Sequence, residues 1–326
     1  MHDYVGSPEQ VRMLLDGTRN LKLKVFSFGR PAAMLHAAER LEFVEIIDRN
    51  VKKKEVKGLS VGQYALLLIT ARTEGTLSRE RVERWFRKSV LKFHLYPEYS
   101  LSCKNLTNQM NRLDERAIEA IERDLAARLI ELGISPSKLI FDTTNRYSHI
   151  EHGEELFQKG NSKQKRFSKN IVGLALTVNE DNLPFISEVY PGNEHDSTVF
   201  VRVFKAMCRR LEELKVNTED LVLVFDKGID SKDNIDMILG KMHVVGSLPR
   251  DDARELLEEA TRKKFEHVYT NADDHDISAW RTRSTFFGRE FEVVVQHNPA
   301  TQARQEETYE RQRAKILEGV EALRKS

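Results

Sequence analysis

Lys138-Leu-Ile-Phe-Asp142 and Leu221-Val-Leu-Val-Phe-Asp226 are two short apolar runs, and one aspartate follows each of them. Apolar runs of this length are typical of buried strands. We predict two neighbouring strands that end at Asp142 and Asp226, with the carboxylates within a few ångström of each other. Carboxylates that close repel unless a cation lies between them. Because Mg²⁺ and Mn²⁺ prefer oxygen ligands, the pattern favours a metal site for phosphoryl transfer. The alternative is two ordinary strand-end acids that pair with surface lysines.

The segments around these two runs predict a mixed sheet. Strands are expected at 171–178 and 185–190, a helix at 197–214, a helix at 231–239, a strand at 242–248 and a helix at 251–264. The first three strands are joined tightly enough for an antiparallel meander, whereas the last two alternate with helices and should be parallel. That order is the one expected of an RNase H-like sheet.

The rest of the chain divides into two further regions. Residues 1–134 read as a helical N-terminal region, with helices at 31–41, 60–70, 79–91 and 111–132. Residues 135–264 would be the RNase H-like core. Residues 265–326 read as the start of a β-rich insertion, with strands at 281–287 and 290–295, followed by a charged helix at 299–324. The expected class is therefore α+β with three regions.

Composition excludes several classes of protein. The 326 residues carry a net charge of +1, so a DNA-binding surface has to come from local clusters of charge. No apolar run approaches the roughly 20 residues of a membrane-spanning helix, and we expect no membrane partner. Cys103 and Cys208 are too few for a disulfide framework or a structural zinc site. With no signal peptide at the N-terminus, we expect a cytoplasmic protein.

A basic segment lies between the first two expected strands. Residues 159–169 hold five cations and no acid, among them Lys163, Lys165, Arg166 and Lys169. Next to a metal site this segment could hold DNA phosphates, although a solvated basic hairpin is an equally common explanation.

Other polar clusters favour structural roles. His195 and Asp196 lie in a turn that leads into a helix, with Asp196 or Ser197 as its N-cap. The spacing of the five acids and histidines between His267 and Asp276 matches no known ligand set, so a polar loop is expected. The cations at 52–54 and 79–88 are typical of solvated helix faces, and they gain interest only if the protein handles DNA.

Several of these segments resemble insertion-sequence transposases. The matching stretches are Phe141-Asp-Thr-Thr144, Gly160-Asn-Ser-Lys163, Pro184 through Ser197, Phe225 through Asn234, Val245 through Asp251 and, in the helical region, Phe28 through Asp48. The branch resembled is the DDE group of the fourth insertion-sequence family, which has an RNase H-like core. The likeness covers most of residues 5–300, and its motifs are specific only when taken together.

The resemblance implies a site, a cofactor and partners. Asp142 and Asp226 would be the first two of three acids that bind two Mg²⁺ or Mn²⁺ ions. Lys163, Lys165, Arg166 and Lys169 would contact DNA phosphates. The partners would be double-stranded DNA, both transposon ends and target, and a second copy in a homodimer. The protein would associate with the nucleoid when it is bound to DNA, and the helical region 1–134 would bind DNA as well.

The third acid of that family is missing from its expected pattern. The family has a Tyr-x2-Arg-x3-Glu-x6-Lys helix after the insertion, but after Tyr309 this chain has Gln312 at the Arg position and Ile316 at the Glu position. We therefore expect a transposase chain that ends before its third acid. Two alternatives stay open. One is a DNA-binding remnant or regulator without activity, and the other is an unrelated RNase H-like nuclease.

Overall fold

The structure is a computed structural model that describes residues 8, 12, 26–52, 58–75, 77–94, 101–149, 155–166, 168–226 and 231–325. The chain forms two compact units, and each is built from several stretches. The first holds Met1–Leu139, Thr143–Asn193 and Arg202–Asn217; the second holds Ile140–Asp142, Glu194–Val201 and Thr218–Ser326. The limits at residues 134 and 264 stay a prediction.

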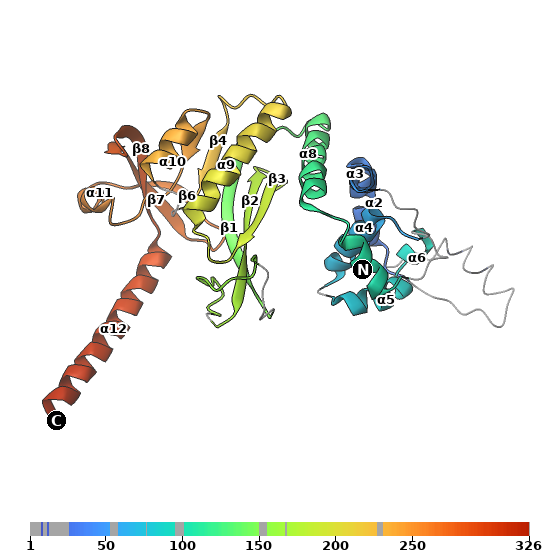
Figure 1. The fold of residues 1–326 in the computed structure, drawn as a ribbon. Helices are drawn as coiled ribbons and strands as arrows, with labels where there is room; N and C mark the ends of the chain where they lie inside the picture. The colour runs from blue at the N-terminus through green and yellow to red at the C-terminus, as the bar shows by residue number, and fades with distance from the viewer. Residues whose placement is uncertain are drawn as a thin grey trace. The chain divides into compact units, whose positions relative to one another are not determined.

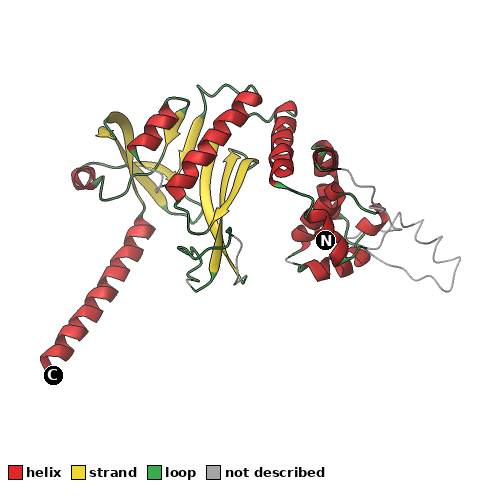
Figure 2. Ribbon diagram, in the orientation of Figure 1, coloured by secondary structure: helices red, strands yellow, loops and turns green. Residues whose placement is uncertain are grey.

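The first third of the described chain is helical, as the sequence indicates (Figure 2). Its helices are α2 (Gly29–Arg40), α3 (Phe43–Asn50), α4 (Val61–Glu74), α5 (Arg79–Lys88), α6 (Leu91–His94), α7 (Cys103–Met110) and α8 (Glu115–Glu131). Ser60 begins α4 as expected, because its hydroxyl accepts from the Gln63 backbone while the Gln63 side chain accepts from the Ser60 backbone. These helices bury two apolar clusters, one around Leu67 and one around Ile46.

A five-stranded sheet follows, and its topology is RNase H-like (Figure 1). Its strands are β1 (Lys138–Ser148), β2 (Asn170–Asn179), β3 (Pro184–Pro191), β4 (Val222–Phe225) and β5 (His243–Val245). They are ordered β3-β2-β1-β4-β5 across the sheet. The pair β2–β3 is antiparallel, with Leu174 opposite Val189, and β4–β5 is parallel, with Leu223 opposite Val244. The mixed α+β fold expected from the order of elements is confirmed.

The expectation that β1 ends at Asp142 is wrong. The strand continues six residues further, to Ser148, and places Asp142 near its middle. The apolar run stops at Phe141, but Thr143 and Thr144 are β-branched residues that suit a pleated backbone. A polar sequence therefore hid the second half of the strand. Asp226 does follow its strand directly, since β4 ends at Phe225.

Three helices accompany the sheet: α9 (Asp196–Glu213), α10 (Lys232–Leu239) and α11 (Arg254–Ala260). Ser231 caps α10 as expected, because its hydroxyl accepts from the Asn234 backbone at 3.2 Å. The hydrogen bonds of α9 begin at the His195 carbonyl, which accepts from the Val199 backbone. The helix therefore starts one residue earlier than a cap at Asp196 would place it. Both β5 and α11 are shorter than predicted. Gly246 and Pro249 follow β5 and disfavour its continuation. The Pro249 carbonyl accepts from the backbones of Asp252 and Ala253 in the turn that leads into α11.

A separate three-stranded antiparallel sheet comes next, where the sequence predicted two strands. Its strands are β6 (Glu266–Thr270), β7 (Asp276–Phe286) and β8 (Arg289–His297). All five residues of β6 are exposed, so no apolar alternation marks this strand in the sequence. The charged helix α12 (Pro299–Lys325) closes the described chain. Within the described ranges, no helix combines the length and the apolar character that a bilayer crossing requires.

Three phenylalanines link α9 to β1 and β4 inside the second unit. The ring of Phe200, 1% exposed, lies 5.2 Å from that of Phe141 and 6.0 Å from that of Phe225. Phe141 and Phe225 immediately precede the two aspartates. Packing of this cluster therefore fixes the backbone on which both carboxylates are carried.

Replacing Phe200 by alanine should leave a large cavity between these strands. We expect Phe200→Ala to lower the free energy of unfolding by about 3–5 kcal/mol, the usual loss for a buried phenylalanine. Urea-induced unfolding followed by circular dichroism measures the loss. A loss below about 1 kcal/mol would show that the cluster does not hold the strands.

Glu180 ties the end of β2 to the start of β1. Its carboxylate accepts from the Ser137 hydroxyl at 2.6 Å, the Ser137 backbone at 3.1 Å and the Lys138 backbone at 3.2 Å. Slight burial raises the pKa of Glu180, but these hydrogen bonds to the charged form outweigh it and lower the pKa from 4.5 to about 2. The ionised carboxylate is therefore the form that stabilises this corner.

Because the folded pKa lies below the unfolded value, the contribution of Glu180 is complete above about pH 4.5 and is lost as the pH falls toward about 2. Glu180→Gln should lower the unfolding midpoint at pH 7, and the difference from the wild type should shrink to nothing over that window. Asp181→Asn is the control, since this neighbouring carboxylate is exposed. A difference that persists at pH 2 would contradict the assignment.

Candidate functional site

Asp142 lies on β1, Asp226 directly follows the neighbouring strand β4, and both are on the same face of the sheet. Burial alternates along β1, so Leu139, Phe141 and Thr143 are buried while Asp142 is exposed. Along β4, Leu223 and Phe225 are buried, and the period of two puts the exposed Asp226 on the side opposite Phe225. Since β1 and β4 are adjacent, the aspartates share the face that points away from the phenylalanine cluster. The neighbouring strands predicted from the sequence are confirmed.

Ser247 fixes the carboxylate of Asp226. Its hydroxyl donates to Asp226 Oδ1 at 2.7 Å. Ser247 comes two residues after β5, and Asp226 comes directly after β4. Because β4 and β5 are parallel, their carboxyl ends meet at one edge of the sheet, which brings the two side chains together. Sequence reasoning gave Ser247 no role, although it lies in one of the segments that resemble the transposases.

The third acid does not join this pair in the part of the chain that the structure describes. No group of three His, Cys, Asp or Glu side chains that could hold a metal occurs among the described residues. Tyr309 and Ile316, the two landmarks of the expected motif, lie on α12 with 65% and 67% of their surface exposed. Two carboxylates alone supply few ligands for an ion that takes six.

The basic segment is joined to the polar half of β1, within the first unit. Asn145 Nδ2 donates to the Asn161 carbonyl at 2.9 Å, and the Lys163 backbone donates back to Asn145 Oδ1 at 3.0 Å. The Lys163 ammonium donates to the carbonyl of Thr143 and, at 3.2 Å, to its hydroxyl. Lys163 therefore uses two of its three donors to hold the segment, and it bonds to the residue that follows Asp142 in the chain.

The remaining cations of the segment differ in exposure. Lys165 and Arg166 are exposed, and the Arg166 guanidinium lies 5.9 Å from the centre of the Tyr147 ring. Lys169 is half-buried. A Cβ added at Gly160 would lie 2.0 Å from the Gly192 carbonyl oxygen, so the base of the segment accepts only glycine there. The segment is thus a loop that hydrogen bonds fix to β1, with the exposed cations Lys165 and Arg166 at its tip.

The polar cluster between His267 and Asp276 is only in part the expected loop, because residues 271–275 form a turn while His267 lies on β6 and Asp276 begins β7. Asn271 Oδ1 accepts from the backbones of Asp273 and His275 at 3.0 Å, and Asp274 has a φ of 61°. His267 Nε2 lies 3.3 Å from Asp276 Oδ1. His195 likewise has a local partner, because its Nδ1 lies 3.0 Å from Ser197 Oγ.

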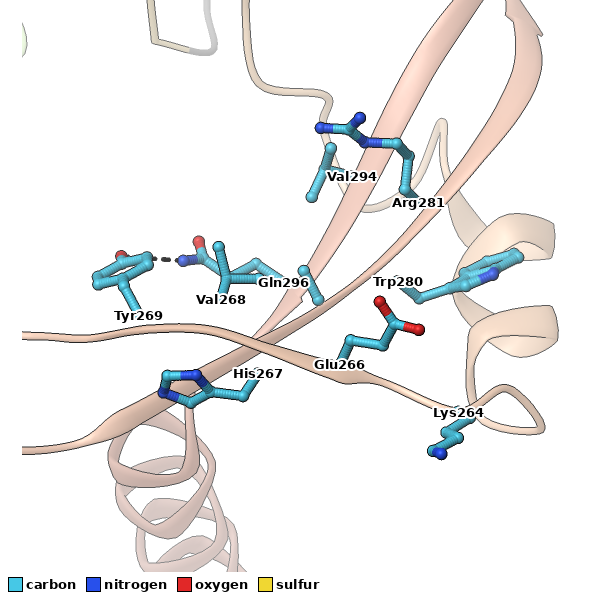
Figure 3. Close-up of a pocket in the computed structure, with 10 residues that line it drawn as sticks. Lys264, Glu266, His267, Val268, Tyr269, Trp280, Arg281, Val294 and Gln296 are labelled. Atoms are coloured by element: carbon cyan, nitrogen blue, oxygen red, sulfur yellow. Dashed lines mark hydrogen bonds between the residues drawn. The ribbon is translucent and has the colours of Figure 1, made fainter.

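A hollow of about 800 Å³ lies on the three-stranded sheet (Figure 3). Side chains of both charges line it, and Gln296 donates to the Tyr269 hydroxyl at 3.0 Å within it. The lining residues are Lys264, Glu266, His267, Val268, Tyr269, Ala279, Trp280, Arg281, Val294 and Gln296. Neither Asp142 nor Asp226 is among them, so the hollow is not the candidate metal site.

Comparisons with known proteins find a likeness to solved structures but not to a family model or a curated sequence. No protein-family model matches the chain, and no curated protein matches its sequence. Among solved structures, a chain of the "Mos1 transposase paired-end complex with left transposon end" is similar at 12% identity and a TM-score of 0.23, over 78% of this chain and 85% of that one. With a TM-score this low, the RNase H-like assignment rests on strand order and direction.

Lys163→Met should release the basic segment from β1. Removing the ammonium leaves the Thr143 carbonyl without this donor, so amides at 159–166 should exchange hydrogen for deuterium several-fold faster. Lys165→Met is the control, because Lys165 is exposed and its removal should leave the exchange unchanged. Equal exchange in the two variants would contradict an anchoring role for Lys163.

Proposed function

We propose that this chain is the core of a transposase that cleaves DNA and joins the cut end to target DNA with divalent metal ions. The observation that carries the proposal is the placement of Asp142 and Asp226 on one face of adjacent strands in an RNase H-like sheet. Two exposed carboxylates on that face supply the hard oxygen ligands that Mg²⁺ and Mn²⁺ prefer.

The residues would take separate roles. Asp142 and Asp226 would hold the metal ions, and Ser247 would orient the carboxylate of Asp226 through its hydrogen bond. Bound ions would lower the pKa of the attacking water or hydroxyl and stabilise the leaving oxygen. Lys165 and Arg166 would contact phosphates through exposed charges. Lys169 and the remaining donor of Lys163 would add contacts from the base of the same segment.

The donor set fits a divalent ion only in part. Asp142 and Asp226 suit Mg²⁺ or Mn²⁺ in chemistry, but no third carboxylate accompanies them among the described residues. A complete site for two ions would need a further acid. The resemblance also implies a homodimer and association with the nucleoid, and both belong to the proposal.

Asp142→Asn and Asp226→Asn should each abolish metal-dependent DNA processing and leave DNA binding within a few-fold of the wild type. The amide keeps the size of the side chain but removes the charge that binds the ion. In the assay, the protein is incubated in Mg²⁺ or Mn²⁺ with two DNA substrates. One is a supercoiled plasmid, and the other is a linear duplex that ends at the sequence flanking the protein's own gene. Nicked plasmid reports cleavage, and joined duplex reports strand transfer.

Glu194→Gln is the matched control, since it removes one carboxylate from the same unit outside the two strands. Its products should equal those of the wild type. Full activity in either aspartate variant would overturn the site assignment. Nicking without joining would favour an unrelated RNase H-like nuclease.

The absence of a third acid in the described residues favours a second candidate function. In this second function, the chain would bind transposon ends without cutting them and would so block an intact transposase. Binding of the flanking-end duplex by the wild type, with neither nicks nor joined products in Mg²⁺ or Mn²⁺, would select this function over the first.

A further inference from the structure

Helix α5 presents a row of cations on its outward face. Its sequence, Arg79-Glu-Arg-Val-Glu-Arg-Trp-Phe-Arg-Lys88, holds five cations and two acids. Arg81, Arg84 and Lys88 follow the spacing of one helix face, at i, i+3 and i+7, and all three are exposed. Arg87 is also exposed, and it pairs with Glu83 at 2.6 Å.

The opposite face of α5 is firmly packed. Val82 and Phe86 are 2% and 5% exposed and belong to the apolar cluster around Leu67 of α4. Arg79, at the first turn, donates to the Thr107 hydroxyl of α7 at 3.3 Å. The packing fixes the rotation of α5 about its axis, and therefore which side chains point outward.

The outward cations lack the compensation found elsewhere in the chain. Among the described residues, no carboxylate forms an ion pair with Arg81, Arg84 or Lys88, and the like charges of Arg84 and Lys88, at i and i+4 on one helix face, repel each other. On α12, by contrast, Arg311 pairs with Glu307 at 2.8 Å and Arg313 with Glu310 at 3.4 Å. A bound polyanion would neutralise these like charges, which have no carboxylate to do so within the described residues.

The connection between α4 and α5 fits a helix-turn-helix pair. It spans residues 75–78, of which residue 76 is outside the described part, and it contains Gly75 at a φ of 145°. A turn of three or four residues with a glycine is typical of the motif, whose second helix enters the major groove of DNA. An α-helix with its side chains is about 10–12 Å across, which suits a major groove about 12 Å wide, and α5 with its 10 residues is about 15 Å long.

We propose that α5 is a docking surface for duplex DNA, with Arg81, Arg84 and Lys88 on the phosphates that border the major groove. The inference rests on the proposed function, because the two share DNA as partner. It adds a second surface, in the helical region, that does not involve Asp142, Asp226 or residues 159–169. The cations at 79–88, which in the sequence are typical of a solvated helix face, would thus bind DNA.

The test compares DNA binding by the full chain and by the triple variant Arg81→Gln, Arg84→Gln, Lys88→Gln. Fluorescence anisotropy with a labelled duplex of about 30 base pairs is recorded in EDTA, from about 50 to 200 mM salt, so that no cleavage takes place. Each lost phosphate contact removes about 0.9 from the slope of log K against log salt. We expect the slope to fall by about 2 to 3 and the affinity to fall about tenfold or more at about 100 mM salt.

Two further variants separate charge from fold. Arg304→Gln, Arg311→Gln, Arg313→Gln removes the same charge from α12 and should bind DNA within about twofold of the wild type. Arg81→Lys, Arg84→Lys, Lys88→Arg keeps the charge on α5 and should do the same. Thermal unfolding of all three variants confirms that the helices remain packed.

An unchanged slope in the glutamine variant of α5 would overturn the proposal, as would an equal loss in the α12 variant. Duplex RNA that competes as well as duplex DNA would also overturn it, because the major groove of RNA is too narrow for a helix. The experiment is independent of the metal site. If cleavage is never observed but α5 governs binding, this inference stands and the catalytic proposal fails.

Discussion

The aromatic contact between Phe141, Phe200 and Phe225 is the constraint on which the candidate site depends. Phe200 of α9 packs against one ring on β1 and one on β4, and each of those rings precedes an aspartate. Side chains alternate between the faces of a strand, so burial of the rings forces Asp142 and Asp226 to the other face. A slip of one residue in either strand would bury its carboxylate and expose its phenylalanine.

Polar side chains then arrange what surrounds each aspartate. Ser247 holds the carboxylate of Asp226 at the edge where β4 and β5 end. Lys163 and Asn145 hold the basic segment to the half of β1 that follows Asp142. Both sets of contacts join residues that the pairing of the strands brings together. The exposed charges of Lys165 and Arg166 remain at the tip of the segment.

The helical region obeys a different constraint. Its helices bury Val82, Phe86 and Leu67 in one cluster and turn the cations of α5 outward. In the sequence these cations are indistinguishable from those of any solvated helix, because charge and helical period are the same in both. Burial of the opposite face, and the lack of a carboxylate partner for Arg81, Arg84 and Lys88 within the described residues, separate α5 from α12.

The sequence by itself determined the order of the five strands of the mixed sheet and of the three helices among them, the two aspartates after apolar runs, and the caps at Ser60 and Ser231. These features depend on local burial periodicity and local hydrogen bonds, which are written along the chain. Only the tertiary structure decided that β1 runs to Ser148, that β6 exists, and that Ser247 and Lys163 have their partners. The polar half of β1 and the exposed β6 show no apolar period, and both hydrogen bonds join residues about 20 apart, 247 to 226 and 163 to 143. Contacts of that kind follow from strand pairing, so no local pattern could have indicated them.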